Sequence, residues 1–249
     1  MMRDLFAALL LATAAQGQVQ VHAGVEAGVP LTNTLSGSSA FSSPGNGFLL
    51  VDSFSSNTKR LLIGPTIRID LPFRLGIEVD GLYQRINYEH FSSIFLGSGG
   101  GSETFSHNTA DRWQFPLLIQ YSPRFPVIKP FVEAGPSFSY IANSHNLSLF
   151  IANAVLDHRE ISSETNHLIE LRRRTVAGAT VGFGVDLHPV FVHIRPEVRY
   201  TRWIASQFSA LSNQALDDLL FPTLGNPPVR IPYLSSNRDQ IDFLLGITF

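Results

Sequence analysis

The last eight residues of the chain, 242–249, alternate in polarity with the period of a β-strand. The apolar face of this segment consists of Phe243, Leu245, Ile247 and Phe249. The opposite face consists of Asp242, Leu244, Gly246 and Thr248, of which only Leu244 is apolar. If the apolar face points outward, the strand is inverted relative to a soluble protein, as a barrel wall requires when its solvent is lipid.

The same alternation occurs eight times along the chain. The expected strands are 19–29, 61–71, 75–84, 112–121, 132–140, 177–187, 192–200 and 242–249. Each is close to the length of about 9–11 residues that a tilted strand needs to cross a bilayer. The connections alternate between short turns, at 72–74, 122–128 and 188–190, and long loops, at about 30–59, 89–110, 142–174 and 206–238.

Short turns at one end and long loops at the other are typical of outer-membrane barrels. The pattern predicts an all-β fold, an eight-stranded antiparallel up-and-down transmembrane β-barrel with short periplasmic turns and long extracellular loops. Four prolines inside the expected strands oppose this fold, because a closed barrel has no edge where a missing N–H is harmless. They are Pro65, Pro116, Pro136 and Pro196, and we expect β-bulges or a hydrated carbonyl at these positions.

The N-terminus resembles a secretory signal peptide rather than a membrane span. Arg3 precedes an apolar run from Leu5 to Ala15, and small residues follow. Cleavage after Gly17 would leave a signal peptide, 1–17, and a mature barrel domain, 18–249; cleavage after Ala14 is the alternative, and a buried N-terminal helix is the competing interpretation. No later run approaches the ~18 apolar residues of a transmembrane helix.

Composition excludes several classes of function. Charged residues make up 15% of the chain, against about 25% in soluble domains, and the formal net charge is −2. Neither value suggests nucleic-acid binding. The chain has no cysteine, which removes disulfides, thiolate metal sites and cysteine nucleophiles.

Aromatic residues fall at two levels of the expected strands. Tyr83, Trp113, Tyr140 and Tyr200 lie at loop ends, whereas Tyr121 and Phe249 lie at turn ends. Two aromatic belts that flank an aliphatic band fit the preference of such side chains for the headgroup region.

The inward faces predict a polar network in the lumen. Its expected members are Glu26, Arg68, Glu78, Asp80, His193, Arg195, Glu197, Arg199 and Asp242. Because isolated charges would be costly there, we expect Arg68 near Glu78, Arg199 near Asp242, and Asp242 near Glu26. An acid/base site at His193, Glu197 and Asp242 is the functional alternative to a salt-bridged network that only fills the lumen. The structural network is favoured, because charges at alternate positions are what a polar lumen contains anyway.

The long loops are where this fold keeps its function. Segment 147–156 is apolar enough for a short helix, and 208–221 has nearly helical spacing of its apolar residues. We expect both amphipathic stretches to pack over the barrel mouth. Arg172, Arg173 and Arg174 at the outer rim could bind lipopolysaccharide phosphates, or form a solvated cluster offset by nearby glutamates.

Three stretches, 129–138, 195–203 and 242–249, resemble the small bacterial outer-membrane β-barrel (porin-like, OmpA/OmpX-type) family. This resemblance covers essentially the whole mature chain. It implies a location in the bacterial outer membrane after export, and it implies recognition by the barrel assembly machinery through Phe249. It implies no particular activity.

Together these features predict a monomeric, non-enzymatic barrel with a structural role or a surface-binding role through its extracellular loops. The expected partners are outer-membrane lipid and lipopolysaccharide, with no nucleic acid, and the extracellular ligand stays open. We expect no catalytic, cofactor-binding or metal residues, and no cofactor. The alternatives are a narrow passive small-solute channel, a lipid-modifying outer-membrane enzyme, and a soluble lipocalin-like barrel whose apolar face points inward.

Overall fold

The computed structural model describes residues 19–45, 48–58, 60–97, 100–123, 129–154, 157–165, 171–187, 192–208 and 234–249. The predicted signal peptide, 1–17, lies outside these residues. The strands are β1 (Gln20–Pro30), β2 (Leu35–Ser36), β3 (Ser39–Gly45), β4 (Phe48–Ser56), β5 (Leu62–Asp70), β6 (Leu75–Asp80), β7 (Leu82–Leu96), β8 (Gly100–Tyr121), β9 (Lys129–Ala154), β10 (Asp157–Thr165), β11 (Thr175–Asp186), β12 (His193–Trp203), β13 (Ser235–Ser236) and β14 (Asp239–Thr248). A single 3₁₀ turn, η1 (Pro72–Arg74), joins β5 to β6. In the described part of the chain, no helix is long and apolar enough to cross a membrane.

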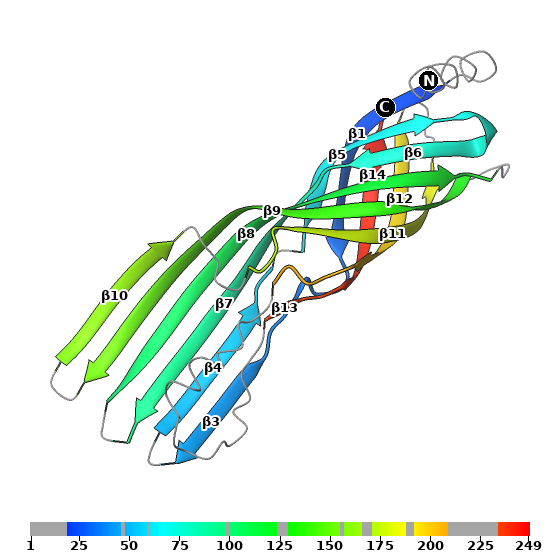
Figure 1. The fold of residues 1–249 in the computed structure, drawn as a ribbon. Coiled ribbons are helices and arrows are strands. Elements are labelled where there is room, and N and C mark those ends of the chain that lie inside the picture. The colour runs from blue at the N-terminus through cyan, green and yellow to red at the C-terminus, as the bar shows by residue number, and fades with distance from the viewer. Residues whose placement is uncertain are drawn as a thin grey trace, which may run out of the picture.

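The wall of the barrel is a closed antiparallel sheet. Its strands follow the order β1–β5–β6–β8–β9–β11–β12–β14, and β14 pairs with β1 to close the ring. The expectation of an eight-stranded up-and-down barrel is therefore confirmed. Both termini of the barrel lie at the end that carries the short turns (Figure 1).

The third wall strand is interrupted at Gly81, between β6 and β7. The Gly81 N–H donates to the carbonyl of Pro65 at 3.0 Å, and Tyr83 then pairs with Ile63, so the wall continues past the break. Glycine is required opposite this point, because a Cβ on Gly64 would lie 1.8 Å from the Gly81 carbonyl oxygen.

The two faces of the wall have the predicted orientation. Outward side chains are apolar and open to the surroundings: Val25, Ile119 and Val132 are 52, 63 and 55% exposed. Inward side chains are polar and buried, with Glu26 and Arg68 each 2% exposed. This is the reverse of a lipocalin-like barrel, and it excludes that alternative.

The four wall prolines do not cause the bulges that we expected. The pairing register runs without a shift through Pro65, Pro136 and Pro196, and Pro116 lies in one continuous register with β9. The register shift between β8 and β9 lies instead between Ala110 and Arg112, at the loop end of the wall.

Beyond the loop end, the sheet opens and projects away from the barrel (Figure 1). We call this part the blade. It consists of β3, β4, β10 and the distal parts of three long strands, which are residues 89–96 of β7, 100–107 of β8 and 147–154 of β9. The strand order in the blade is β10–β9–β8–β7–β4–β3. β8 has 22 residues and β9 has 26, about twice what one membrane crossing needs, so the excess length lies outside the bilayer.

The blade corrects our expectation for the long loops. Residues 89–110 are mostly strand and form the distal parts of β7 and β8. The helix expected within 147–156 is absent from the described residues there, because 147–154 belongs to β9 and pairs with β8 and β10. In the other amphipathic stretch, 209–221 lies outside the described residues.

Candidate functional site

Polar side chains fill the lumen in three layers along the barrel axis. The layer at the turn end centres on Arg68, whose Nε lies 3.1 Å from Asp70 Oδ1 and whose Nη1 lies 3.2 Å from Asp186 Oδ2. Asp186 Oδ1 also lies 3.0 Å from His193 Nδ1, and the His193 ring is 4.7 Å from the ring of His22. A cavity of about 460 Å³ is lined in part by Arg68, Asp186 and His193 and by the η1 turn.

The central layer is organised by one arginine. Nitrogen atoms of the Arg199 guanidinium lie within ion-pair distance of five carboxylates: Glu197 at 2.5 Å, Glu78 and Asp80 at 2.6 Å, Glu133 at 2.7 Å and Glu26 at 3.4 Å. Arg195 pairs with Glu78 and stacks over Phe131, with the guanidinium carbon 4.3 Å from the ring centroid. All of these ionic side chains are almost completely shielded from solvent.

Glycines on β11 make room for this layer. A Cβ on Gly182 would lie 2.6 Å from Glu133 Oε1 and 3.1 Å from Arg199 Cγ. A Cβ on Gly184 would meet Phe131 and Glu197 at 2.5 and 2.7 Å. The large side chains therefore occupy the space that the missing β11 side chains leave at this level.

The layer at the loop end is held by hydrogen bonds from Arg112. Its Nε donates to Ser139 Oγ at 2.9 Å, and its Nη2 donates to Gln240 Oε1 at 3.0 Å. The Trp203 indole N–H donates to the same Gln240 oxygen at 3.1 Å, and Gln240 Nε2 donates to Asp242 at 2.8 Å. Arg112 thus links β8, β9 and β14 across the interior.

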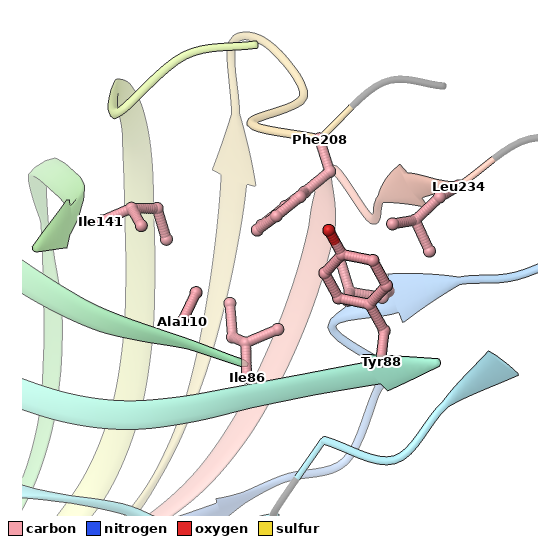
Figure 2. Packing of buried hydrophobic residues seen from close by; sticks show 7 residues of the cluster. Ile86, Tyr88, Ala110, Ile141, Phe208 and Leu234 are labelled. Atoms are coloured by element: carbon pink, nitrogen blue, oxygen red, sulfur yellow. The ribbon is translucent and has the colours of Figure 1, made fainter. Parts of the chain in front are cut away.

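An apolar cluster, which we call the plug, lies above the third layer (Figure 2). Its members are Leu35, Ile86, Tyr88, Ala110, Ile141, Phe208 and Leu234, each no more than 2% exposed. Tyr88 and Phe208 meet edge to face at 5.8 Å. The pairing of β2 with β13 and of Leu171 with Phe208 holds three loop segments over the mouth.

The structure places all nine predicted network residues inside the lumen, each at most 8% exposed. Two of the three expected proximities hold in the sheet register, but the ion pairs are made with other carboxylates. Arg68 lies opposite Glu78 in the sheet, yet it pairs with Asp70 and Asp186. Arg199 lies opposite Asp242, yet the five carboxylates within ion-pair distance of its guanidinium are other residues, and Asp242 accepts a hydrogen bond from Gln240 instead.

Asp242 is also displaced from Glu26, because it lies opposite Pro30 while Glu26 lies opposite Gly246. The acid/base alternative fails on the same geometry. His193, Glu197 and Asp242 belong to three different layers, and His193 and Glu197 are four positions apart on β12, about 13 Å along the strand. These groups do not converge on one point where a substrate could bind.

Among the described residues, one group has the spacing of metal ligands. Carboxylate oxygens of Glu26, Glu78 and Glu197 lie within 4.8 Å of one another. Two guanidinium groups already share these oxygens, since Arg199 binds all three glutamates and Arg195 binds Glu78. A metal ion at this position would have to displace existing ion pairs.

The predicted aromatic residues occupy two levels of the outer wall. Trp113 lies between Tyr83 and Tyr140 in the sheet, with the Tyr83 ring 5.4 Å away, and Tyr200 lies near the loop end of β12. At the turn end, Tyr121 pairs with Leu75 and Val132. Phe249 is 71% exposed at the same end, and its N–H donates to the Ala23 carbonyl.

Arg172, Arg173 and Arg174 are exposed just beyond the loop-end belt. The backbone N–H groups of Arg172 and Arg173 donate to the Gln207 carbonyl. Arg174 Nη1 donates to the carbonyl of Ala142 at 3.2 Å. The segment is therefore anchored through its backbone, and the side chains of Arg172 and Arg173 point away from the packed interior.

Sequence reasoning missed the plug and most of the loop-end layer. Ile86, Tyr88 and Ala110 continue the inward face of β7 and β8 past the point where we ended the strands. The signal was present, because the inward face changes from polar at Gln84 to apolar at Ile86 and Tyr88. Glu133 and Asp186 also contribute to the lumen network, and their ion pairs with Arg199 and Arg68 were not anticipated.

The family comparison agrees with this architecture. The family model for the outer membrane protein beta-barrel domain matches residues 14–207. The crystal structure of the outer membrane protein OprG from Pseudomonas aeruginosa is similar at 13% identity and a TM-score of 0.40, over 92% of each chain. No curated protein sequence matches the chain. A family model that spans most of the chain identifies it as an outer-membrane β-barrel protein, and the chain belongs to the outer membrane protein β-barrel domain family.

Proposed function

We propose that this protein is a non-conducting, non-enzymatic barrel that anchors the blade in the outer membrane and presents it as a binding surface outside the cell. The observation that carries the proposal is a sealed lumen beneath a projecting sheet. The barrel interior holds three polar layers and an apolar plug, whereas the blade offers an open surface on strands beyond the membrane.

The closed lumen argues against the alternative of a passive channel. Eight strands enclose only enough space for side chains. Here that space is occupied by Arg68, Arg112, Arg195 and Arg199 together with their partners, each arginine at most 4% exposed. A solute would have to break several buried ion pairs to pass, and each such break is costly.

Conductance measurements test the sealed lumen. In planar lipid bilayers, the purified protein should give no discrete current steps under conditions where a general-diffusion porin does. The variant Tyr88→Ala/Phe208→Ala should stay silent too, because it opens the plug but leaves the charged layers intact. Reproducible steps from the wild-type protein would favour the channel instead.

Cysteine labelling tests whether the blade is extracellular, and the absence of native cysteine makes the assay clean. Ser163→Cys, exposed on β10, should react with a membrane-impermeant maleimide on intact cells. Arg74→Cys, exposed at the opposite end in η1, should react only after the outer membrane is permeabilised. The reverse pattern would place the blade in the periplasm and end the proposal.

The exposed arginines at the blade's base support an interaction with the surrounding lipid as part of the same proposal. Arg172–Arg174 lie beside Ala142, two residues past Tyr140 of the aromatic belt. Headgroup phosphates lie at this level, and guanidinium groups bind phosphate oxygens through charge-assisted hydrogen bonds.

A further inference from the structure

The face of the blade that continues the lipid-facing wall contains a groove with a volume of about 530 Å³. Its apolar lining includes Phe91 of β7, Phe105 of β8, and Leu147 and Leu149 of β9. Such a volume falls within the range of about 300–1,000 Å³ that small-molecule sites occupy.

The lining is open to its surroundings. Phe105 is 45% exposed, and Leu147 and Leu149 are 50 and 38% exposed. Phe91 and Phe105 lie opposite each other in the sheet, with ring centroids 4.8 Å apart and the rings inclined at 46°. The two rings form the centre of an exposed apolar patch.

Hydrogen-bonding groups border this patch. Glu89 and His107 form the next outward pair along β7 and β8, with the His107 Nδ1 3.7 Å from Glu89 Oε1 and both side chains 52% exposed. Aromatic rings beside a carboxylate and an imidazole match a pyranose ring, which has an apolar C–H face and a rim of hydroxyl groups. An acyl chain would use the rings and leave the polar border unpaired.

The position of the groove distinguishes saccharide from hydrocarbon. Phe91 and Phe105 lie on the same face of the sheet as Tyr83 and Trp113 of the loop-end belt. They are eight residues farther from the barrel along β7 and β8, roughly 26 Å of strand. Between the two levels, Asp111 accepts hydrogen bonds from the Tyr83 hydroxyl at 2.7 Å and from Asn143 at 3.2 Å. A carboxylate on the outward face marks the end of the apolar band, so the groove lies above the headgroups.

A basic surface suited to the same occupant lies further along β9 toward the barrel. Arg174 contacts Ala142, five residues before Leu147 on β9. An amphiphile whose acyl chains contact the wall and whose phosphates bind at Arg172–Arg174 would place its sugars beside Leu147 and Leu149. The outer leaflet's lipopolysaccharide has these three parts in this order.

We infer that this groove binds the oligosaccharide of lipopolysaccharide molecules next to the barrel. The inference rests on the proposed function, since it requires the blade to be extracellular. Phe91 and Phe105 provide the stacking surface, and Glu89 and His107 provide hydrogen bonds to hydroxyl groups.

Saturation-transfer difference NMR tests the site on the full-length protein in detergent micelles. The probe is the host lipopolysaccharide, deacylated to its soluble phosphorylated oligosaccharide. Ring C–H protons of the sugar should be saturated by the wild-type protein, and the signal should fall at least fivefold in Phe91→Ser/Phe105→Ser. The control Phe95→Ser removes a phenylalanine that is 45% exposed on the same face but is not part of the groove lining, and it should leave the signal unchanged.

Three outcomes overturn the inference. These are no saturation with the wild-type protein, equal saturation in the double variant, and loss of all signal when the oligosaccharide is dephosphorylated, which would assign binding to the arginines alone. A heat-modifiable gel shift equal to that of the wild type shows that each variant is folded. Because the NMR measurement in micelles does not depend on orientation, its result is independent of the labelling test, and failure of the two proposals can be told apart.

Discussion

Replacing Arg199 with methionine should destabilise the barrel by about 3–5 kcal/mol, the cost of leaving a buried ion-pair network without its cation. The guanidinium is shared by five buried carboxylates, and only Arg195 would remain to neutralise that layer. The measurement is the free energy of unfolding in urea, with the protein in detergent micelles.

Arg202→Met is the matched control for this result. Arg202 lies three residues further along β12 and pairs with Asp239 on the outer surface, where the two side chains are 52 and 45% exposed. Such exposed pairs contribute only about 0–1 kcal/mol. Adding Glu133→Gln to Arg199→Met should recover part of the loss, because it removes one unpaired carboxylate. Equal stabilities for the Arg199 and Arg202 variants would show that the charge network does not stabilise the barrel.

Arginine on the lipid-facing side of the wall should have the second large effect. Val79→Arg and Leu117→Arg are each expected to cost roughly 2–4 kcal/mol, because both positions lie midway between the two aromatic belts. The two residues pair with each other, Leu117 lies four residues from both Trp113 and Tyr121 on β8, and their side chains are 44 and 45% exposed. Unfolding in lipid vesicles gives the free energies.

Depth provides the control for these two variants. Leu75→Arg places the same charge on β6 beside Tyr121, at the turn-end belt, where an arginine can reach the headgroups and should cost about 0–1 kcal/mol. If all three variants unfolded with the same free energy, the wall would not experience a hydrocarbon gradient.

The sequence predicted the wall well because lipid imposes one strict rule on each strand. Backbone groups must pair within the wall, and side chains must alternate between hydrocarbon and lumen. In strands such as 177–187 and 242–249, the alternation of residue types therefore shows which side chains face the lipid and which face the lumen. The interior of β12, with His193, Arg195, Glu197 and Arg199, was assigned in the same way.

The ion pairs could not be predicted by the same reasoning. We paired charges on adjacent strands, but Arg199 of β12 reaches across the lumen to Glu78 of β6 and Glu133 of β9. Strand tilt and stagger determine which residues share a level, and neither is encoded in a single strand. In the narrow interior, the ion-pair partner of a long side chain depends on its level along the barrel axis and on its length, rather than on which strands are adjacent in the sheet.

The blade was missed because its strands obey no such rule. Segments like 100–110 carry mostly small and polar residues on both faces, so they show no clear alternation. They become strands through pairing with neighbours, such as Phe105 with Phe91 and Leu149. Non-local pairing of this kind leaves little trace in local composition.

β8 and β9 pass from the bilayer into the blade as uninterrupted strands, and this continuity has a mechanical consequence. With no linker between the two parts, the blade is a rigid extension of the barrel, like a stiff mast. Any tilt of the barrel therefore displaces the blade by a distance that grows with height above the membrane. A mast of about 30 Å, the span of nine strand residues, moves its tip by about 5 Å when the base rocks by about 10°. A load on the tip is transmitted as torque to the membrane, where the resistance of the lipid and the packed interior sets how far the mast can lean.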